Sequence, residues 1–190
     1  MLFAKAVVFV LETFLGLFSL ALLLRFLLQL VRAPARNQLS HFVVALTDFV
    51  VRPARRVIPG LLGLDLSSLV LAWLVEFVLL LAVLMVRGAD LHGDLPVLRL
   101  ALLAGLNLVR LGIYIIIGAT VVQALLSWVS PGGSPLAPVL SALTRPLLSP
   151  LRRWIPPLGN VDLSPLFLLV ACQLVIMVPL AWLESLLRLF

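Results

Sequence analysis

Four apolar stretches divide the chain, and each is long enough to cross a lipid bilayer as a helix. They cover residues 6–31, 66–86, 111–129 and 163–182. At about 1.5 Å of rise per residue, such stretches match a hydrocarbon core about 30 Å thick. The third stretch lies in a longer run, 95–129, which fits one long tilted helix or a surface helix followed by a span. We favour a single crossing, because no Pro/Gly cluster within the run supplies a turn.

Two proline-rich connectors, residues 32–64 and 130–161, join the spans within each half, and together they hold ten of the 13 prolines. Each contains a moderately apolar segment, 39–51 and 136–148, which is too short to span the membrane as a helix. In the first segment Phe42, Leu46 and Phe49 share one helical face, and Asp48 lies off it. This pattern predicts an amphipathic helix at the membrane surface.

Composition supports a membrane protein and gives no sign of an enzyme. Apolar residues make up 63% of the chain and charged residues 12%, against about 45–50% and about 25% in an average globular domain. The single cysteine, Cys172, excludes an intramolecular disulfide and a cysteine-based zinc site. His41 and His92 stand alone, without a metal-binding or catalytic motif around them. We therefore predict no catalytic residues, no metal and no cofactor.

The chain repeats itself at an offset of 97 residues. The stretch R-P-A-R-R-V-I-P from Arg52 aligns without a gap on S-P-L-R-R-W-I-P from Ser149, and the following D-L-S begins at Asp65 and at Asp162. We predict two repeats, residues 1–94 and 95–190, each made of a span, a surface helix, a P-x-R-R-x-I-P connector and a second span. The expected fold is an all-α membrane protein with four transmembrane helices in two parallel repeats.

The distribution of cations predicts the orientation in the membrane. The connector side carries eight cations: Arg32, Arg36, Arg52, Arg55, Arg56, Arg145, Arg152 and Arg153. The other side carries four: Lys5, Arg87, Arg99 and Arg188. The positive-inside rule places the connectors in the cytoplasm and both termini outside. The net charge of +6 is then explained by anionic lipid headgroups as partners rather than by nucleic acid.

The repeated Arg pairs and the aspartates that follow them are the first candidate site residues. Prolines flank each Arg pair, block helix continuation and hold the cations at headgroup level. Arg55 with Arg56 and Arg152 with Arg153 then form a dock for anionic lipid or a partner protein, or act only as a topology signal. The first aspartate of each D-L-S motif is expected to cap the next helix, to pair with an arginine of its own connector, or both.

Polar residues inside the spans are the second set of candidates. Glu76 lies mid-span and aligns with Gln173, and we expect both to point inward, because a charge facing lipid costs at least about 2.5 kcal/mol. Arg25 is expected to approach Glu76 or to extend to the interface. Glu12 is expected to meet Arg110 near the outer face. Such groups serve an ion or proton path, or they only pin helices together.

The duplicated motif and the stretch S-W-V-S-P-G-G-S-P-L from Ser127 resemble the YggT family of bacterial membrane proteins. The family motif falls on Pro53, Arg55, Arg56, Pro59, Asp65 and Ser67, and on Pro150, Arg152, Arg153, Pro156, Asp162 and Ser164. The first copy departs from the pattern, because it lacks the Ser-Trp-Val-Ser-Pro stretch.

The resemblance implies an inner-membrane protein linked to osmotic or ion stress in some lineages and to division or nucleoid organisation in others. Two functions follow as hypotheses. One is support of osmotic or ion homeostasis, and the other is a scaffold that recruits a cytoplasmic partner or anionic lipid. A homo-oligomer or a membrane-protein partner fits either hypothesis.

Overall fold

The computed structural model describes residues 2–34, 37–58, 60, 64–88, 97–129, 134–154 and 162–189. Its regular elements are all helical: α1 (Leu2–Leu30), α2 (Gln38–Ala54), α3 (Leu66–Val86), α4 (Val97–Val129), α5 (Ala137–Trp154), α6 (Ser164–Val175), the π-helical turn η1 (Ile176–Leu180) and α7 (Ala181–Leu189). The predicted all-α class is confirmed.

Four helical stretches are long and apolar enough to cross a membrane. They cover Leu2–Leu30, Leu66–Val86, Val97–Ser127 and Ser164–Leu187. The run from Val97 is one uninterrupted helix, which agrees with a single crossing. In the last stretch Pro179 sits in η1, because proline offers no backbone N–H and the wider π-turn absorbs the missing bond.

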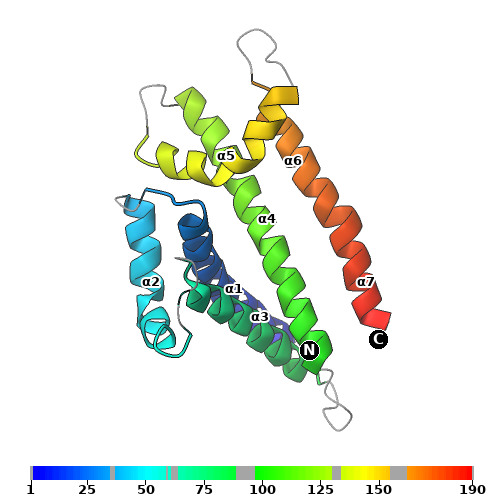
Figure 1. Cartoon of the computed structure of the whole chain (residues 1–190). Helices are drawn as coiled ribbons and strands as arrows, with labels where there is room; N and C mark the ends of the chain where they lie inside the picture. Colours follow the sequence, from blue (N-terminus) through cyan, green and yellow to red (C-terminus); the bar gives the residue numbers. More distant parts are fainter. Residues whose placement is uncertain are drawn as a thin grey trace.

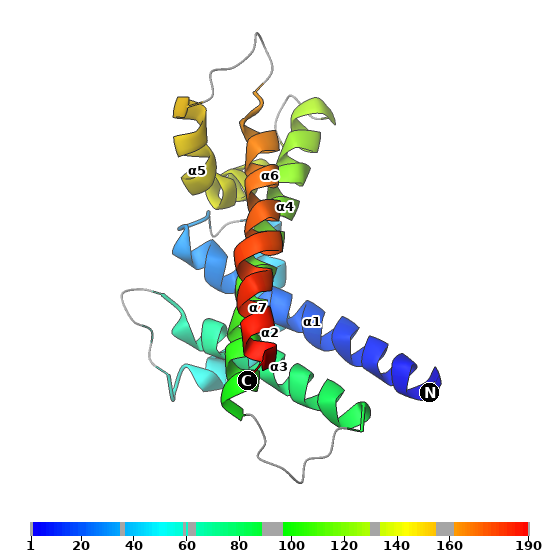
Figure 2. The same cartoon turned by 90° about the vertical axis from the view of Figure 1, so that its right-hand side faces the viewer.

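Both termini lie at one end of the molecule, and α5 lies at the other (Figures 1 and 2). Helices α1 and α3 run side by side in opposite directions and cross α4 obliquely. Helices α6 and α7 continue one another along α4 (Figure 1). Each half therefore leaves the terminal end with one long helix and returns to it with another.

Three apolar clusters join these helices. The first includes Leu22, Val51, Ala72 and Leu108 and so connects α1, α2, α3 and α4. The second includes Leu28 and Val139 and connects α1 to α5 across the two repeats. The third places Leu148 against Leu168 and Cys172, which is buried as a small core residue. Helix α4 contributes residues to all three clusters and so connects the two repeats.

The equivalent helices begin in equivalent ways 97 residues apart. The side-chain oxygen of Asn37 accepts a bond of 2.9 Å from the backbone N–H of Leu39 at the start of α2. The hydroxyl of Ser134 accepts a bond of 3.3 Å from the N–H of Leu136 just before α5. The Asn37 amide also donates to the carbonyl of Pro135, which ties the two connectors together.

The expectation that proline blocks helix continuation at the Arg pair holds in the first connector, where α2 ends before Arg55, and is wrong in the second. Helix α2 includes Pro53 in its last turn, and α5 includes Pro146 and Pro150 and ends beyond Arg152 and Arg153. A proline breaks only the bond to the preceding turn, so a helix with other packing contacts survives with a kink. Figure 1 shows the resulting bend in α5.

Helix α2 has one buried side and one exposed side. Val43, Thr47 and Val51 are buried against the rest of the protein. Phe42 and Phe49 are exposed on its outer side. The position of this outer side at a membrane surface stays a prediction.

Candidate functional site

A buried arginine on α1 organises the densest polar cluster in the described part of the chain. The side chain of Arg25 is only 7% exposed. Its Nη1 donates to Thr47 Oγ1 at 2.9 Å, and its Nη2 donates to Asp48 Oδ1 at 3.1 Å. Its Nε lies 3.5 Å from Asp65 Oδ2. Arg25 therefore joins the end of α1 to α2 and to the residue that precedes α3.

Two further arginines complete the carboxylate contacts of this cluster. Arg55 contacts Asp65 through two bonds, Nη2 to Oδ2 at 2.5 Å and Nε to Oδ1 at 3.3 Å. Arg52 Nε lies 2.6 Å from Asp48 Oδ2. We call Arg25, Thr47, Asp48, Arg52, Arg55 and Asp65 the Arg25 cluster. Its three guanidinium groups face two carboxylates, so one net positive charge remains.

The charges of the Arg25 cluster stabilise one another. Burial raises the pKa of Asp48, but hydrogen bonding to Arg25 and the positive charges of Arg52 and Arg25 outweigh it, so the pKa lies below its ordinary value. The hydrogen bond to Asp65 raises the pKa of Arg55 against the opposing effect of burial. Both shifts favour the charged forms of Asp48 and Arg55.

The expected contact between Arg25 and Glu76 is wrong, because Asp48 and Asp65 lie closer to the end of α1 that carries Arg25. The alternative expectation, that Arg25 extends to the membrane interface, stays a prediction. A guanidinium carries five N–H donors, and this site offers oxygen acceptors from two elements, as a buried cation requires. The sequence pattern had placed Asp48 only on the polar side of a surface helix.

The second repeat keeps the Arg–Asp contact but exposes it. Arg152 Nε donates to Asp162 Oδ2 at 2.9 Å, 97 residues after the Arg55–Asp65 contact. The Asp162 side chain is 41% exposed, whereas that of Asp65 is 2% exposed. Burial opposes ionisation of Asp162, but bonds from Ser164 and the charge of Arg152 hold its pKa below the ordinary value. The predicted pairing within each connector is thus found in both repeats.

The predicted helix cap is found only in the second repeat. Asp162 Oδ1 accepts a bond of 2.9 Å from the backbone N–H of Ser164. Asp65 makes no such bond, because its carboxylate is occupied by Arg25 and Arg55. Its backbone carbonyl accepts instead from the Ser68 hydroxyl at 2.8 Å.

The two mid-span polar residues lie in different surroundings. Glu76 is buried, and its Oε2 accepts a bond of 3.4 Å from the Asn107 amide on α4. Gln173 is exposed on α6. The expectation that both point inward is therefore right for Glu76 and wrong for Gln173. Buried positions on α6 fall on Leu168 and Cys172, so the helix presents a different face to its neighbours.

The expected contact between Glu12 and Arg110 is also wrong. Arg110 on α4 forms an ion pair with Glu184 on α7. Glu12 is exposed on α1. The terminal end of the second repeat is therefore held by a pair that joins its first and last long helices.

The second arginine of each connector faces outward. Arg56 and Arg153 are both exposed. Neither has an ion-pair partner in the part of the chain that the structure describes. The first arginine of each pair therefore has a structural contact, and the second is free to meet a ligand.

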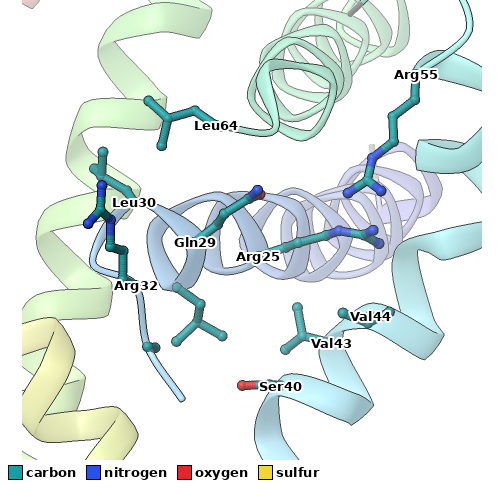
Figure 3. A pocket seen from close by; sticks show the side chains of 11 residues that line it. Arg25, Gln29, Leu30, Arg32, Ser40, Val43, Val44, Arg55 and Leu64 are labelled. Atoms are coloured by element: carbon teal, nitrogen blue, oxygen red, sulfur yellow. The ribbon is translucent and has the colours of Figure 1, made fainter. Parts of the chain in front are cut away.

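A cavity of about 590 Å³ opens beside the Arg25 cluster, between the end of α1 and the first half of α2. Arg25, Arg32 and Arg55 line it together with Gln29 and Ser40, and apolar side chains close its walls. Figure 3 shows Arg25 and Arg55 at one end, Arg32 at the other and Gln29 between them. A smaller cavity of about 290 Å³ continues past Arg55 to Asp65.

The sequence reasoning missed several contributors to this site. Arg32 lines the cavity and Asp48 binds Arg25. Asn107 bonds Glu76 in mid-span, and Glu184 pairs with Arg110. The sequence does contain one indication that Asp48 is special. At the offset of 97 it aligns with Arg145, which carries the opposite charge, so the repeat is not kept at this position. Among the described residues, no group of three metal-ligating side chains gathers at the site or elsewhere.

Comparison with known proteins identifies the family. The CCB3/YggT family model matches twice, over residues 4–86 and 102–183. An uncharacterised protein of Pseudomonas aeruginosa is 40% identical over 171 residues, which cover 90% of this chain and 86% of that protein. The uncharacterised protein YggT of Escherichia coli K12 is 35% identical over 163 residues, covering 85% of this chain and 82% of that protein. No solved structure matches. The chain belongs to the CCB3/YggT family of helical membrane proteins.

Proposed function

We propose that this protein is a non-enzymatic scaffold of the bacterial inner membrane that gathers anionic lipid at its basic connectors. One observation carries the proposal. The same Arg–Asp contact recurs 97 residues apart, at Arg55–Asp65 and Arg152–Asp162, and it leaves the next arginine of each connector exposed.

The contact fixes the connectors and so determines where the exposed cations lie. Each ion pair holds its connector at the start of the following long helix, which is the boundary between the apolar span and the aqueous side. Arg56 and Arg153 are then held near lipid headgroups. Each arginine there contributes about 1 kcal/mol of attraction to an anionic surface.

The other hypothesis, support of osmotic or ion homeostasis by conduction or by action on a transporter, is favoured by polar groups at one depth of the spans. Glu76 has a hydrogen-bond partner inside the bundle, whereas Gln173 lies on its outside. These two groups do not line a common path. The scaffold therefore accounts better for the described residues, and the homeostasis hypothesis stays a prediction.

Lipid selectivity in reconstituted vesicles tests the proposal. We expect spin-labelled phosphatidylglycerol to be enriched over phosphatidylcholine in the immobilised lipid around the protein. The double variant R56Q/R153Q is expected to reduce this enrichment by about half or more, because both exposed cations are lost. The matched control is K5Q/R87Q, which removes two exposed cations from the other end. Equal enrichment in both variants would contradict the proposal.

The proposed orientation needs its own test. Cytoplasmic connectors and external termini follow from eight cations on the connector side against four on the other. Reporter domains fused after Arg87 and after Phe190 should both report the outer side. A cytoplasmic signal from either fusion would contradict this orientation.

A further inference from the structure

The cavity beside the Arg25 cluster combines positive charge with an apolar wall. Arg25, Arg32 and Arg55 contribute three cations to its lining. Leu28, Leu30, Val43, Val44 and Leu64 contribute apolar surface. Its volume of about 590 Å³ lies within the range of small-molecule sites, about 300–1,000 Å³. A ligand that fills it should therefore carry a negative group and an apolar body.

The three cations differ in how much bonding capacity they keep for a ligand. Arg25 contacts Thr47, Asp48 and Asp65 through all three of its nitrogens, which fixes its position, and so contributes mainly its charge. Arg55 bonds Asp65 through Nε and one N–H of Nη2, which leaves both N–H groups of Nη1 and the second of Nη2. Arg32 is exposed and has no ion-pair partner among the residues that the structure describes. It is the cation of this cavity with a whole guanidinium to offer.

The backbone around Arg32 is unusual for its residue type. Arg32 has φ of 50°, in the left-handed region. It ends α1 in a two-bond turn: its own N–H donates to the Gln29 carbonyl at 3.0 Å, and the N–H of Ala33 donates to the Leu28 carbonyl at 2.8 Å. Glycine is the usual residue at this position, because it has no Cβ to clash. An arginine here places a long cationic side chain over the cavity at some expense in stability.

The second repeat lacks most of the polar residues that line this cavity. At the offset of 97, Arg25 aligns with Val122, Gln29 with Leu126 and Arg32 with Val129. Only Arg55 has a charged equivalent, Arg152. The features that make the cavity basic are thus confined to the first repeat, whereas the connector cations are common to both.

We propose that this cavity binds the phosphate group of one anionic phospholipid, with Arg32 and Arg55 donating to the phosphate oxygens and the apolar wall taking the start of an acyl chain. A guanidinium matches phosphate through paired N–H donors. The apolar wall favours a lipid over free phosphate. This inference deepens the proposed function and rests on it, since it names one specific site within a generally basic face.

Thermal unfolding in detergent with short-chain lipids tests the site. Dioctanoyl phosphatidylglycerol should raise the Tm of the unmodified protein in a saturable way, because a ligand that binds the folded state stabilises it. Dioctanoyl phosphatidylcholine and millimolar inorganic phosphate should not. Arg32→Gly should weaken phosphatidylglycerol binding by about tenfold or more, since charged hydrogen bonds are lost. Glycine suits the left-handed position, so this variant keeps its fold.

Two further variants sharpen the result. Val44→Trp fills the cavity from its wall and should also abolish the Tm shift. R56Q/R153Q leaves the cavity lining intact and should keep the shift, even though it lowers general lipid selectivity. An unchanged shift in Arg32→Gly would overturn the proposal. An equal shift with inorganic phosphate would overturn the assignment to lipid. The two proposals can fail separately. Unchanged lipid selectivity in R56Q/R153Q would contradict the proposed function alone, and an unchanged Tm shift in Arg32→Gly would contradict the cavity site alone.

Discussion

The two repeats contain the same Arg–Asp contact in opposite surroundings. In the first repeat Asp65 is 2% exposed and is shared by Arg25 and Arg55. In the second repeat Asp162 is 41% exposed, bonds Arg152 and caps the next helix. The repeated motif has the same arginine and aspartate in both repeats, so it cannot explain why one aspartate is buried and the other is exposed.

Residues outside the motif create the difference. Position 25 is arginine in the first repeat and aligns with Val122 in the second. In the second repeat the buried threonine of the connector helix, Thr144, bonds Gln123 at 2.6 Å instead of a cation. One buried charge therefore converts a surface ion pair into a network that joins three helices, and it brings a basic cavity with it.

Removal of Arg25 should have the largest effect. Arg25→Leu leaves Asp48 and the buried Asp65 without their shared cation, and we expect a loss of about 3 kcal/mol in the free energy of unfolding. The matched variant in the second repeat is Gln123→Leu, which removes one bond to Thr144 and should cost about 1 kcal/mol. Denaturant titration in micelles measures both. Equal losses would show that Arg25 has no special role.

Double-mutant cycles should give a larger coupling energy for the Arg–Asp contact of the first repeat than for that of the second. For Arg55 and Asp65, a two-bond contact to a buried carboxylate, we expect a coupling energy of about 2 kcal/mol. For Arg152 and Asp162, both largely exposed, we expect about 0.5 kcal/mol. A matched cycle with Arg153 in place of Arg152 should give no coupling. A larger coupling in the second repeat would reverse our interpretation.

The equivalent mid-span positions should respond differently to an apolar residue. Glu76→Leu leaves the Asn107 amide unpaired inside the bundle and should cost about 1–2 kcal/mol. Glu76→Gln keeps an acceptor and should change stability by less than about 1 kcal/mol. Gln173→Leu should be neutral, because its side chain is exposed. Normal abundance of Glu76→Gln without complementation of an osmotic-stress phenotype would instead make Glu76 a functional centre.

The end of α1 should show the smallest effect, and in the opposite direction. Arg32→Gly relieves the left-handed backbone and should stabilise the fold by about 0.5 kcal/mol in the absence of lipid. The equivalent change Val129→Gly is expected to destabilise or have no effect, because it adds only flexibility at a helix end. Thermal unfolding without added lipid distinguishes the two. A loss of stability in Arg32→Gly would contradict a strained arginine.

The sequence predicted most of the fold and the contacts that lie close together along the chain. Four apolar stretches and the offset of 97 residues were sufficient for the spans, and the short separation of Arg55 and Asp65 was sufficient for their pairing. Contacts between residues on different helices were harder to predict from the sequence. Arg25 with Asp48, Glu76 with Asn107 and Arg110 with Glu184 each depend on how helices rotate and cross, and hydropathy along one helix carries little of that information.

The proline interpretation failed in the second connector for a related reason. Local rules treat a proline as the end of a helix, but packing of α5 against Leu168 and Cys172 keeps the helix continuous through Pro146 and Pro150. Tertiary contacts outweighed a local preference.

The central claim is that the first repeat alone carries a specific anionic-lipid site. Native mass spectrometry of the protein released from phosphatidylglycerol-containing nanodiscs tests it most directly, because it counts retained lipids per chain. We predict one retained phosphatidylglycerol for the unmodified protein and for R56Q/R153Q, and none for Arg32→Gly. Two retained lipids per chain, or one retained by Arg32→Gly, would contradict the account.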